Sequence, residues 1–178
     1  EIKPAATTAE RVTQSVIHVD PANKVKLLVE LLRDPQITRA LIFTRTKHGA
    51  DKVVKALDKE NYKSAAIHGN KSQANREKAL AGFKDGKILA LVATDIAARG
   101  IDVDGVSHVF NFDLPFVPES YVHRIGRTAR AGADGEAIAF CIPEDRGLLR
   151  DIEKTIRQAV PVKEHALGLK VDELAPNF

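Results

Sequence analysis

The chain has 178 residues, of which 44% are hydrophobic and 29% charged, values typical of a globular protein that argue against disorder. Its length suits one domain with short extensions, and its formal net charge of +3 with a pI near 9.0 permits a polyanionic partner without requiring one. No apolar run approaches the roughly 20 residues that a membrane-spanning helix needs, so we expect no membrane partner.

The two ends and the single cysteine indicate how the chain is organised. It begins with Glu1 and contains no methionine, so we expect it to be a piece of a longer protein. Residues 1–14 are predicted to be an interdomain linker, residues 15–160 the folded domain, and residues 161–178 a tail. Cys141 lies in the apolar run AIAFCI, which is typical of a core position and of a reducing compartment, so we expect a cytoplasmic protein.

Short apolar runs alternate with amphipathic segments along the chain, which is the pattern of repeated βαβ units. The runs ALIF and ILALVA are apolar without alternation, as in a parallel sheet that is covered on both faces. We therefore predict an α/β sandwich with a mostly parallel central sheet and helices on both faces. In chain order the predicted strands are Ser15–Val19, Ala40–Thr44, Ser64–Ile67, Ile88–Ala93, Val106–Asn111 and Ala137–Ile142.

Helices are predicted between the strands, where apolar residues recur at the spacing of one helix face. Three polar residues, Asp20, Thr46 and Ser72, can accept hydrogen bonds from the free amides of a first turn. Proline suits the first position of a helix, so Pro118 is a further start. The helix after Pro118 is predicted to run to about Gly126, and the last helix from about Asp145 to Gln158.

Polar side chains follow several of the predicted strands. Thr44, His68, Thr94 and Asp113 each fall at a strand end or just past it. The carboxyl ends of parallel strands meet at one edge of a sheet, where α/β proteins bind their ligands. We therefore expect these residues to share one functional edge.

The stretch YVHRIGRTARAG, residues 121–132, holds three arginines within seven residues. A helix would place Arg124 and Arg127 on one face, with Arg130 past its end. Like charges this close repel one another unless anions lie among them, so either acidic side chains or phosphates must neutralise them. One interpretation is a solvated basic helix end; the other is phosphoryl recognition, to which the planar guanidinium is suited.

The stretch VATDIAARGIDV, residues 92–103, places a short polar segment after a buried strand. Gly100 permits close approach of a ligand to the backbone, and the Asp102 carboxylate can accept hydrogen bonds from ribose hydroxyls. The alternative is an ordinary exit from a strand, with Asp95 capping the next turn.

In IHGNKSQANRE, residues 67–77, a predicted helix begins at Ser72. Lys71 and Arg76 place positive charge near its amino end, against the helix dipole, and a bound phosphate would resolve that conflict. The alternative is ordinary surface charge. The sequence contains no G-x-x-x-x-G-K-[ST] phosphate loop, and its six histidines and single cysteine have no metal-ligand spacing, so we expect no metal site.

Together, and in this order, these stretches resemble the second RecA-like domain of a DEAD-box RNA helicase. LIFTRTK is similar to motif IV of that family, SQANR to its QxxR element, VATDIAARGIDV to motif V and HRIGRTAR to motif VI. The resemblance covers about residues 15–160 and implies a RecA-like three-layer sandwich. The stretch NFDLPFVPESYVHRIGRTARAG is similar to the corresponding sequence of the bacterial RhlE type. One departure is Ala129, where the family commonly has glycine.

The resemblance implies roles for the nucleotide side of the edge. Arg127 and Arg130 match arginine fingers that reach the γ-phosphate of ATP. His123 and Arg124 match residues that couple the motifs of the two domains around the nucleotide, and all four are candidate catalytic residues. Asp102 matches the aspartate that contacts the ATP ribose. The phosphates and Mg²⁺ would be held mainly by a first domain that this chain lacks.

The resemblance also implies an RNA-binding strip, whose contacts would be to the backbone and therefore independent of base sequence. Its predicted members are Arg45, Gly69, Asn70, Gln73, Arg76, Thr94, Asp95, Arg99 and Gly100.

The implied function is that of one half of an ATP-dependent RNA helicase, which separates strands locally and hydrolyses no ATP in isolation. Its implied partners are RNA, an N-terminal RecA-like domain in the same chain, and proteins of ribosome assembly or RNA decay. Two alternatives remain open. The chain can be a non-enzymatic RNA-binding module that uses the same basic edge, or a DNA-directed relative within helicase superfamily 2.

Overall fold

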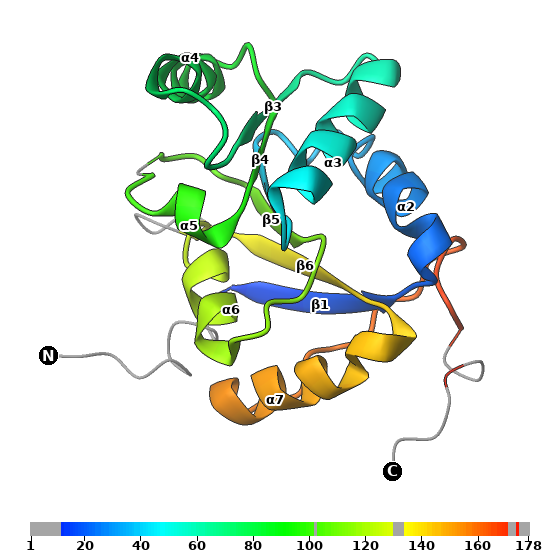
Figure 1. The fold of residues 1–178 in the computed structure, drawn as a ribbon. Helices are drawn as coiled ribbons and strands as arrows, with labels where there is room; N and C mark the ends of the chain where they lie inside the picture. The colour runs from blue at the N-terminus through cyan, green and yellow to red at the C-terminus, as the bar shows by residue number, and fades with distance from the viewer. Residues whose placement is uncertain (1–11, 102, 130–133, 171–173, 175–178) are drawn as a thin grey trace, which may run out of the picture.

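The computed structural model describes residues 12–101, 103–129, 134–170 and 174. Its strands and helices alternate along the chain (Figure 1). Within the described residues, no helix has both the length and the apolar character needed to cross a membrane. The strands are β1 (Thr13–His18), β2 (Ala40–Phe43), β3 (Ser64–Ile67), β4 (Ala90–Ala93), β5 (His108–Asn111) and β6 (Glu136–Cys141). The helices are α2 (Lys24–Leu31), α3 (Lys47–Lys59), α4 (Gln73–Lys84), α5 (Asp95–Ala98), α6 (Pro118–Ile125) and α7 (Arg146–Ile156), with 3₁₀ turns η1 (Pro21–Asn23) and η2 (Pro143–Asp145).

The strands form one six-stranded sheet in the order β1-β6-β5-β2-β4-β3. Every pairing in it is parallel, so the sheet is wholly rather than mostly parallel. All six predicted strands are present, with ends displaced by at most two residues, and the α/β prediction is confirmed. Parallel neighbours need a crossover, and the helices provide it.

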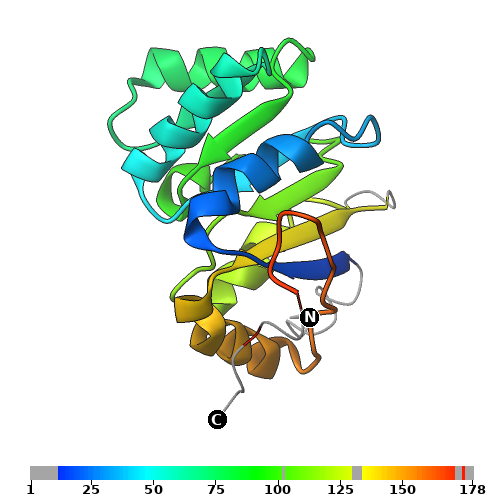
Figure 2. The same ribbon diagram turned by 90° about the vertical axis from the view of Figure 1, so that its right-hand side faces the viewer.

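Helices cover both faces of the sheet and make three layers (Figures 1 and 2). On one face, α2 and α3 bury Leu27, Leu28 and Leu57 against a core that includes Ile42. On the other face, α4, α6 and α7 bury side chains such as Phe83, Tyr121 and Ile152. Cys141 lies in this second core, and its burial raises the pKa of the thiol to about 12, which confirms the predicted core position.

Side-chain caps set the starts of two helices, as predicted. The Thr46 hydroxyl accepts a hydrogen bond from the Gly49 amide at 3.0 Å at the start of α3, and the Ser72 hydroxyl accepts one from the Asn75 amide at 3.1 Å at the start of α4. The Asp20 carboxylate accepts from the Ala22 amide, but the turn that it caps is η1, which leads into α2.

The chain after α7 does not leave the domain as the predicted tail. Residues 161–170, here called the β1 strap, run along the outer edge of β1 (Figure 2). The Val16 amide donates to the Pro161 carbonyl at 2.9 Å, and the Leu169 amide donates to the His18 carbonyl at 2.7 Å. Leu167 packs against the α2–α3 core. The predicted boundary at residue 160 is therefore wrong, because the strap covers an edge strand whose backbone groups need partners.

Substitution of Gly168 tests how closely the β1 strap packs. A Cβ atom there would lie 2.9 Å from the His18 carbonyl oxygen and 3.0 Å from Cγ2 of Ile17, so the strap would have to move. We expect Gly168→Ala to lower the free energy of unfolding by about 1–2 kcal/mol in a urea titration. Gly69→Ala is the matched control: its Cβ would meet nothing within 4 Å. Equal stability of the two variants would show that the strap is not packed on β1.

Candidate functional site

The register of the sheet brings four strand ends to one line. Phe43 at the end of β2 is paired with Ala93 of β4 and Asn111 of β5, and Ala93 is paired with Ile67 of β3. The residues that follow these strands therefore emerge at the same edge of the sheet. Thr44, His68, Thr94 and Asp113 are among them, which confirms that they share one edge; its function stays a prediction.

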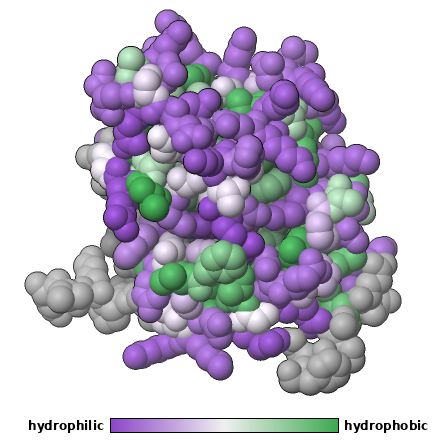
Figure 3. All heavy atoms as spheres, in the orientation of Figure 1, coloured by the Kyte–Doolittle hydropathy of each residue, from purple (hydrophilic) through white to green (hydrophobic). Residues whose placement is uncertain are grey.

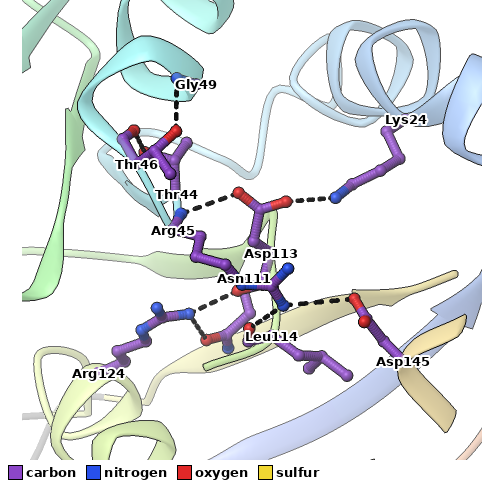
Figure 4. Close-up of polar contacts among 10 residues, drawn as sticks. All are labelled: Lys24, Thr44, Arg45, Thr46, Gly49, Asn111, Asp113, Leu114, Arg124 and Asp145. Atoms are coloured by element: carbon purple, nitrogen blue, oxygen red, sulfur yellow. Dashed lines mark hydrogen bonds and ion pairs between the residues drawn. The ribbon is translucent and has the colours of Figure 1, made fainter. Parts of the chain in front are cut away.

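Arg124 of α6 is a buried cation at this edge. Its side chain is 2% exposed, and its Nε and Nη2 donate to Oδ1 and Oδ2 of Asp95 at 2.7 and 2.8 Å. Nη1 donates to Oδ1 of Asn111 at 2.9 Å and to the Asp113 carbonyl at 2.6 Å (Figure 4). The guanidinium lies over the Phe43 ring. Each of the three guanidinium nitrogens thus has a partner inside the chain.

The contacts of Arg124 bear on two predictions. The prediction that Arg124 and Arg127 share one helix face is wrong: α6 ends at Ile125 with Gly126 as its C-cap, so Arg127 lies beyond the helix. The catalytic role of Arg124 stays a prediction, because its bonds to Asp95 and at Nη1 still leave an N–H of Nη2 for another partner. The Asp95 carboxylate neutralises Arg124 and holds α6 beside the end of β4.

Arg127 differs from Arg124 in both burial and partners. It is half-buried, and its Nη1 donates to the Ile101 carbonyl at 2.6 Å. Among the described residues it contacts no carboxylate, so most of its donors remain available. His123 is exposed on α6 near the same edge. Arg130 and Asp102, the other predicted nucleotide contacts, lie outside the described residues.

Ala129 shows how the arginine segment turns after α6. Its φ is 55°, in the left-handed region that favours glycine, which is the residue that the resembled family commonly has there. The neighbouring Thr128 hydroxyl donates to the Val106 carbonyl at 2.5 Å and holds the turn to the loop before β5. Alanine therefore adopts the glycine conformation at a modest cost in backbone strain.

A small open cavity of about 140 Å³ lies between α5 and α6 at this edge. Arg99, His123, Arg124 and Arg127 line it together with Asp95. Sites that enclose a ligand of nucleotide size are usually larger, about 300 Å³ or more. The cavity therefore has the size and the charge of one wall of a phosphate site, which a second body would complete.

The predicted RNA strip lies along the ends of β3 and β4. Arg76 of α4 donates from Nη1 to the Ala97 carbonyl at 2.5 Å and from Nη2 to the Arg99 carbonyl at 3.1 Å, so it ties α4 to α5 rather than pointing freely outwards. Gly100 has a φ of 77°, which only glycine adopts readily. Arg99 and Gly100 are exposed, as are Gly69, Asn70 and Gln73, and Thr94 is half-buried.

The segment around His68 contains a pair that the sequence analysis missed. His68 is buried, its Nε2 lies 2.9 Å from Oδ1 of Asp51, and its Nδ1 accepts from the Asn70 amide at 3.2 Å. The hydrogen bond from His68 lowers the pKa of the Asp51 carboxyl. The pair orients the Gly69–Asn70 turn, and its only sequence signal is the position of His68 directly before that turn.

Arg45, a predicted member of the RNA strip, has partners within the chain. Its Nη2 donates to the Leu114 carbonyl at 2.7 Å and lies 3.4 Å from Oδ2 of Asp145 (Figure 4). Its Cζ lies 4.1 Å from the centroid of the Phe116 ring. The side chain thus reaches across to the β5–α6 loop. Arg45 therefore joins two loops through Nη2, and its contact with an RNA backbone stays a prediction.

No group of three His, Cys, Asp or Glu side chains in the described part of the chain could hold a metal ion. The carboxylates nearest the cavity are occupied: Asp95 binds Arg124, and Asp113 binds Lys24 at 2.5 Å. The edge offers arginine and backbone donors, which are ligands for phosphate rather than for a cation.

Comparison with known proteins places this edge in a family context. A family model of the helicase conserved C-terminal domain matches residues 23–132. An ATP-dependent RNA helicase, CshA of Listeria monocytogenes, is 46% identical over 157 residues, which cover 88% of this chain but only 30% of the relative. The chain thus spans less than a third of that protein. The RhlE type stays a prediction, because the relatives found carry another name.

Two solved structures have the same fold. The E. coli DEAD-box protein SrmB, in a complex with the regulator of ribonuclease activity A, aligns with a TM-score of 0.87 and 36% identity over 94% of this chain and 98% of that one. The S. cerevisiae protein Dbp5, bound to RNA and ADP BeF3, aligns with a TM-score of 0.83 and 30% identity over 92% of this chain and 44% of that one. The RecA-like fold prediction is therefore confirmed.

Neutralising Asp95 tests the internal role of Arg124. Asp95→Asn leaves a buried guanidinium without its counter-charge. We expect it to lower the free energy of unfolding by about 2 kcal/mol, less than for a fully buried pair, because the Asp95 side chain is 41% exposed. Asp58→Asn, on the exposed side of α3, is the matched control and should change stability by less than about 0.5 kcal/mol. Chemical denaturation of both variants measures the difference, and equal midpoints would contradict the pairing.

Proposed function

Because the chain belongs to the DEAD-box proteins, as their helicase conserved C-terminal domain, we propose that it supplies one half of an ATP-dependent RNA helicase. The observation that carries the proposal is the open cavity at the α5–α6 edge. One of its arginines, Arg124, is satisfied within the chain, while Arg127 has no carboxylate partner among the described residues. This edge has donors for a phosphate but no phosphate-binding loop, so another domain must bring the nucleotide.

On the nucleotide side, Arg127 and Arg130 act as arginine fingers in the proposal. Phosphoryl transfer depends on positioning and on neutralising charge that spreads over the phosphate oxygens, and an arginine from a separate body can supply that charge. The Asp102 carboxylate would accept hydrogen bonds from the ribose, and His123 would contact the opposing domain. ATP supplies the phosphoryl group, with Mg²⁺ held alongside it mainly by the first domain.

On the RNA side, the proposed contacts are the exposed backbone and polar groups at the ends of β3 and β4. Gly69, Asn70 and Gln73 belong to one segment, and Arg99 and Gly100 to the other. Contacts of this kind are to phosphates and sugars and carry no sequence preference, whereas a ribose 2′-hydroxyl separates RNA from DNA. Thr94, Asp95, Arg45 and Arg76 act in this proposal by positioning these segments.

The surface around the cavity supports contact with a first domain. The face in Figure 3 is mostly hydrophilic, with a few separate hydrophobic areas. Ile96 of α5 is 77% exposed, and Phe116 and Val117 before α6 are 65% and 55% exposed. Large apolar side chains exposed near one functional edge indicate a surface that another body covers. We propose that closure of the two domains on ATP and RNA covers it, and that the closed pair separates RNA strands locally.

The cellular location and the protein partners of the whole protein are also part of the proposal. A reduced, buried Cys141 suits the cytoplasm, and the CshA relative comes from a bacterium. SrmB, which is similar over nearly the whole chain, has been crystallised with a regulator of ribonuclease activity. Protein partners in RNA decay or ribosome assembly are therefore part of the proposal.

Reconstitution tests the division of labour between the domains. The chain alone should show no RNA-stimulated ATP hydrolysis, and joining it to a first domain with a phosphate loop should create that activity. Turnover by the chain alone would contradict the proposal. If the joined protein binds RNA equally with and without ATP and never hydrolyses it, the chain is an RNA-binding module. Equal stimulation by RNA and DNA of matched sequence would favour the DNA-directed relative.

Arg127→Ala tests the finger assignment in the joined protein. Loss of a guanidinium that stabilises the transferring phosphoryl group should reduce RNA-stimulated turnover by about 1,000-fold or more. Lys59→Ala, which removes an exposed cation at the end of α3, is the matched control and should leave turnover unchanged. Turnover is measured by phosphate release, and circular dichroism checks the fold of both variants. Normal hydrolysis by Arg127→Ala would remove Arg127 from the mechanism.

A further inference from the structure

Asp113, which follows β5 after Phe112, joins three separate parts of the fold. We call its contacts with Lys24, Arg45 and Arg124 the Asp113 junction (Figure 4). These partners come from the start of α2, the β2–α3 loop and α6. Asp113 is among the residues predicted to lie at the functional edge, and no role was predicted for it.

The carboxylate of Asp113 binds two different groups, one with each oxygen. Oδ1 lies 2.5 Å from Nζ of Lys24, and Oδ2 accepts from the Arg45 backbone amide at 2.8 Å. The side chains of Asp113 and Lys24 are only 19% and 10% exposed, so water screens the ion pair weakly. One oxygen thus neutralises a buried charge, while the other fixes the backbone of a loop.

The backbone carbonyl of Asp113 makes the third contact. It accepts from Nη1 of Arg124 at 2.6 Å, beside the contact between Arg124 and Asn111. Arg124 belongs to α6, the helix that leads into Arg127. The position of the Asp113 backbone therefore bears on where α6 lies.

The β2–α3 loop continues from the junction towards the predicted RNA strip. Arg45 returns to the β5–α6 loop through the Leu114 carbonyl and the Phe116 ring, so the two loops are joined twice. Two residues further on, Nζ of Lys47 donates to Oδ1 of Asn70 at 3.2 Å. An unbroken series of contacts thus connects α6, through Asp113 and the loop, to the Gly69–Asn70 turn.

We propose that Asp113 is a positioning residue that couples the RNA-binding side of the edge to the arginine side. It does so by holding the Arg45 backbone with its carboxylate and Arg124 with its carbonyl. The inference rests on the proposed function, in which Asn70 contacts RNA and Arg127 contacts the nucleotide. A series of contacts alone does not establish coupling, so the test must change the Arg45 contact without removing the rest of the junction.

The simpler role for Asp113 is a stabilising ion pair with Lys24, and the two roles can be separated by substitution. Lys24→Met removes the ammonium and leaves both carboxylate oxygens. Asp113→Asn leaves a single carbonyl oxygen, which the adjacent ammonium of Lys24 attracts, so the amide group turns towards the Arg45 amide and that hydrogen bond is lost. In the double variant Lys24→Met/Asp113→Asn no ammonium competes, and the carbonyl oxygen is free to accept from Arg45. Lys24→Met/Asp113→Ala has no side-chain acceptor at all.

The first measurement is hydrogen exchange of the Arg45 amide, followed by NMR on the chain itself. Loss of the contact should reduce protection of this amide roughly tenfold, the effect of losing one hydrogen bond to a charged group. We expect this reduction in Asp113→Asn and in Lys24→Met/Asp113→Ala. Lys24→Met and Lys24→Met/Asp113→Asn should stay close to the parent chain.

The second measurement is the RNA concentration that half-stimulates ATP hydrolysis in the joined protein. It should rise roughly tenfold in the two variants that lose the Arg45 contact, and return to the parent value in Lys24→Met/Asp113→Asn. A structural ion pair would not give this order. With a purely structural ion pair, Lys24→Met and Asp113→Asn would raise this RNA concentration equally and would lower the thermal unfolding midpoint to the same extent. That result would overturn the proposal.

The two measurements keep this inference distinct from the proposed function. If the joined protein does not hydrolyse ATP, the proposed function fails and coupling through Asp113 fails with it, while the exchange data still decide whether Asp113 holds the loop. If hydrolysis occurs but its RNA dependence is the same in all four variants, coupling is refuted and the proposed function stands. Unchanged Arg45 protection in Asp113→Asn would refute the positioning role itself.

Discussion

The buried ion pair between Arg124 and Asp95 is the interaction on which the functional edge depends. A guanidinium that is 2% exposed must have its charge and its donors satisfied within the protein. Asp95 binds both sides of the fork, and Asn111 and the Asp113 carbonyl take the remaining nitrogen. The pair joins α6 to the end of β4, so the segment with the arginines has a fixed place beside the segment with the backbone donors.

This pair divides the arginines of one short segment into two kinds. Arg124 is neutralised inside the chain and gives α6 its position, whereas Arg127, past the helix end, donates only to the Ile101 carbonyl among the described residues. Repulsion between neighbouring cations is then small, because one of them already has a counter-charge. The domain can therefore hold Arg127 at this edge and stay folded. The positive charge of Arg127 remains available to an anion that another domain brings.

Much of the fold follows from patterns that depend on nearby residues. Unbroken apolar runs predicted the buried strands, and the hydroxyls of Thr46 and Ser72 predicted two helix starts. The common edge of Thr44, His68 and Thr94 follows from parallel pairing alone. These features depend on local spacing and on the geometry of a parallel sheet, both of which can be derived from a sequence.

The remaining features depend on long-range contacts. The direction of the Arg124 fork is set by Asp95 and Asn111, and that of Arg45 by the β5–α6 loop, more than 60 positions away in the chain. The β1 strap was predicted as part of a tail because Pro161 and Gly168 are typical of a linker, yet amides of the strap pair with β1. A motif therefore identifies which residues gather at a site, but not which of them the fold uses for itself.

The most direct test of this account is a crystal structure of the chain joined to its first domain, with RNA and a non-hydrolysable ATP analogue bound. The account predicts that Arg124 stays paired with Asp95 while Arg127 lies within hydrogen-bonding distance of the terminal phosphate. It would be contradicted if Arg124 left Asp95 to bind the phosphate, or if Arg127 remained on the Ile101 carbonyl with no contact to the nucleotide.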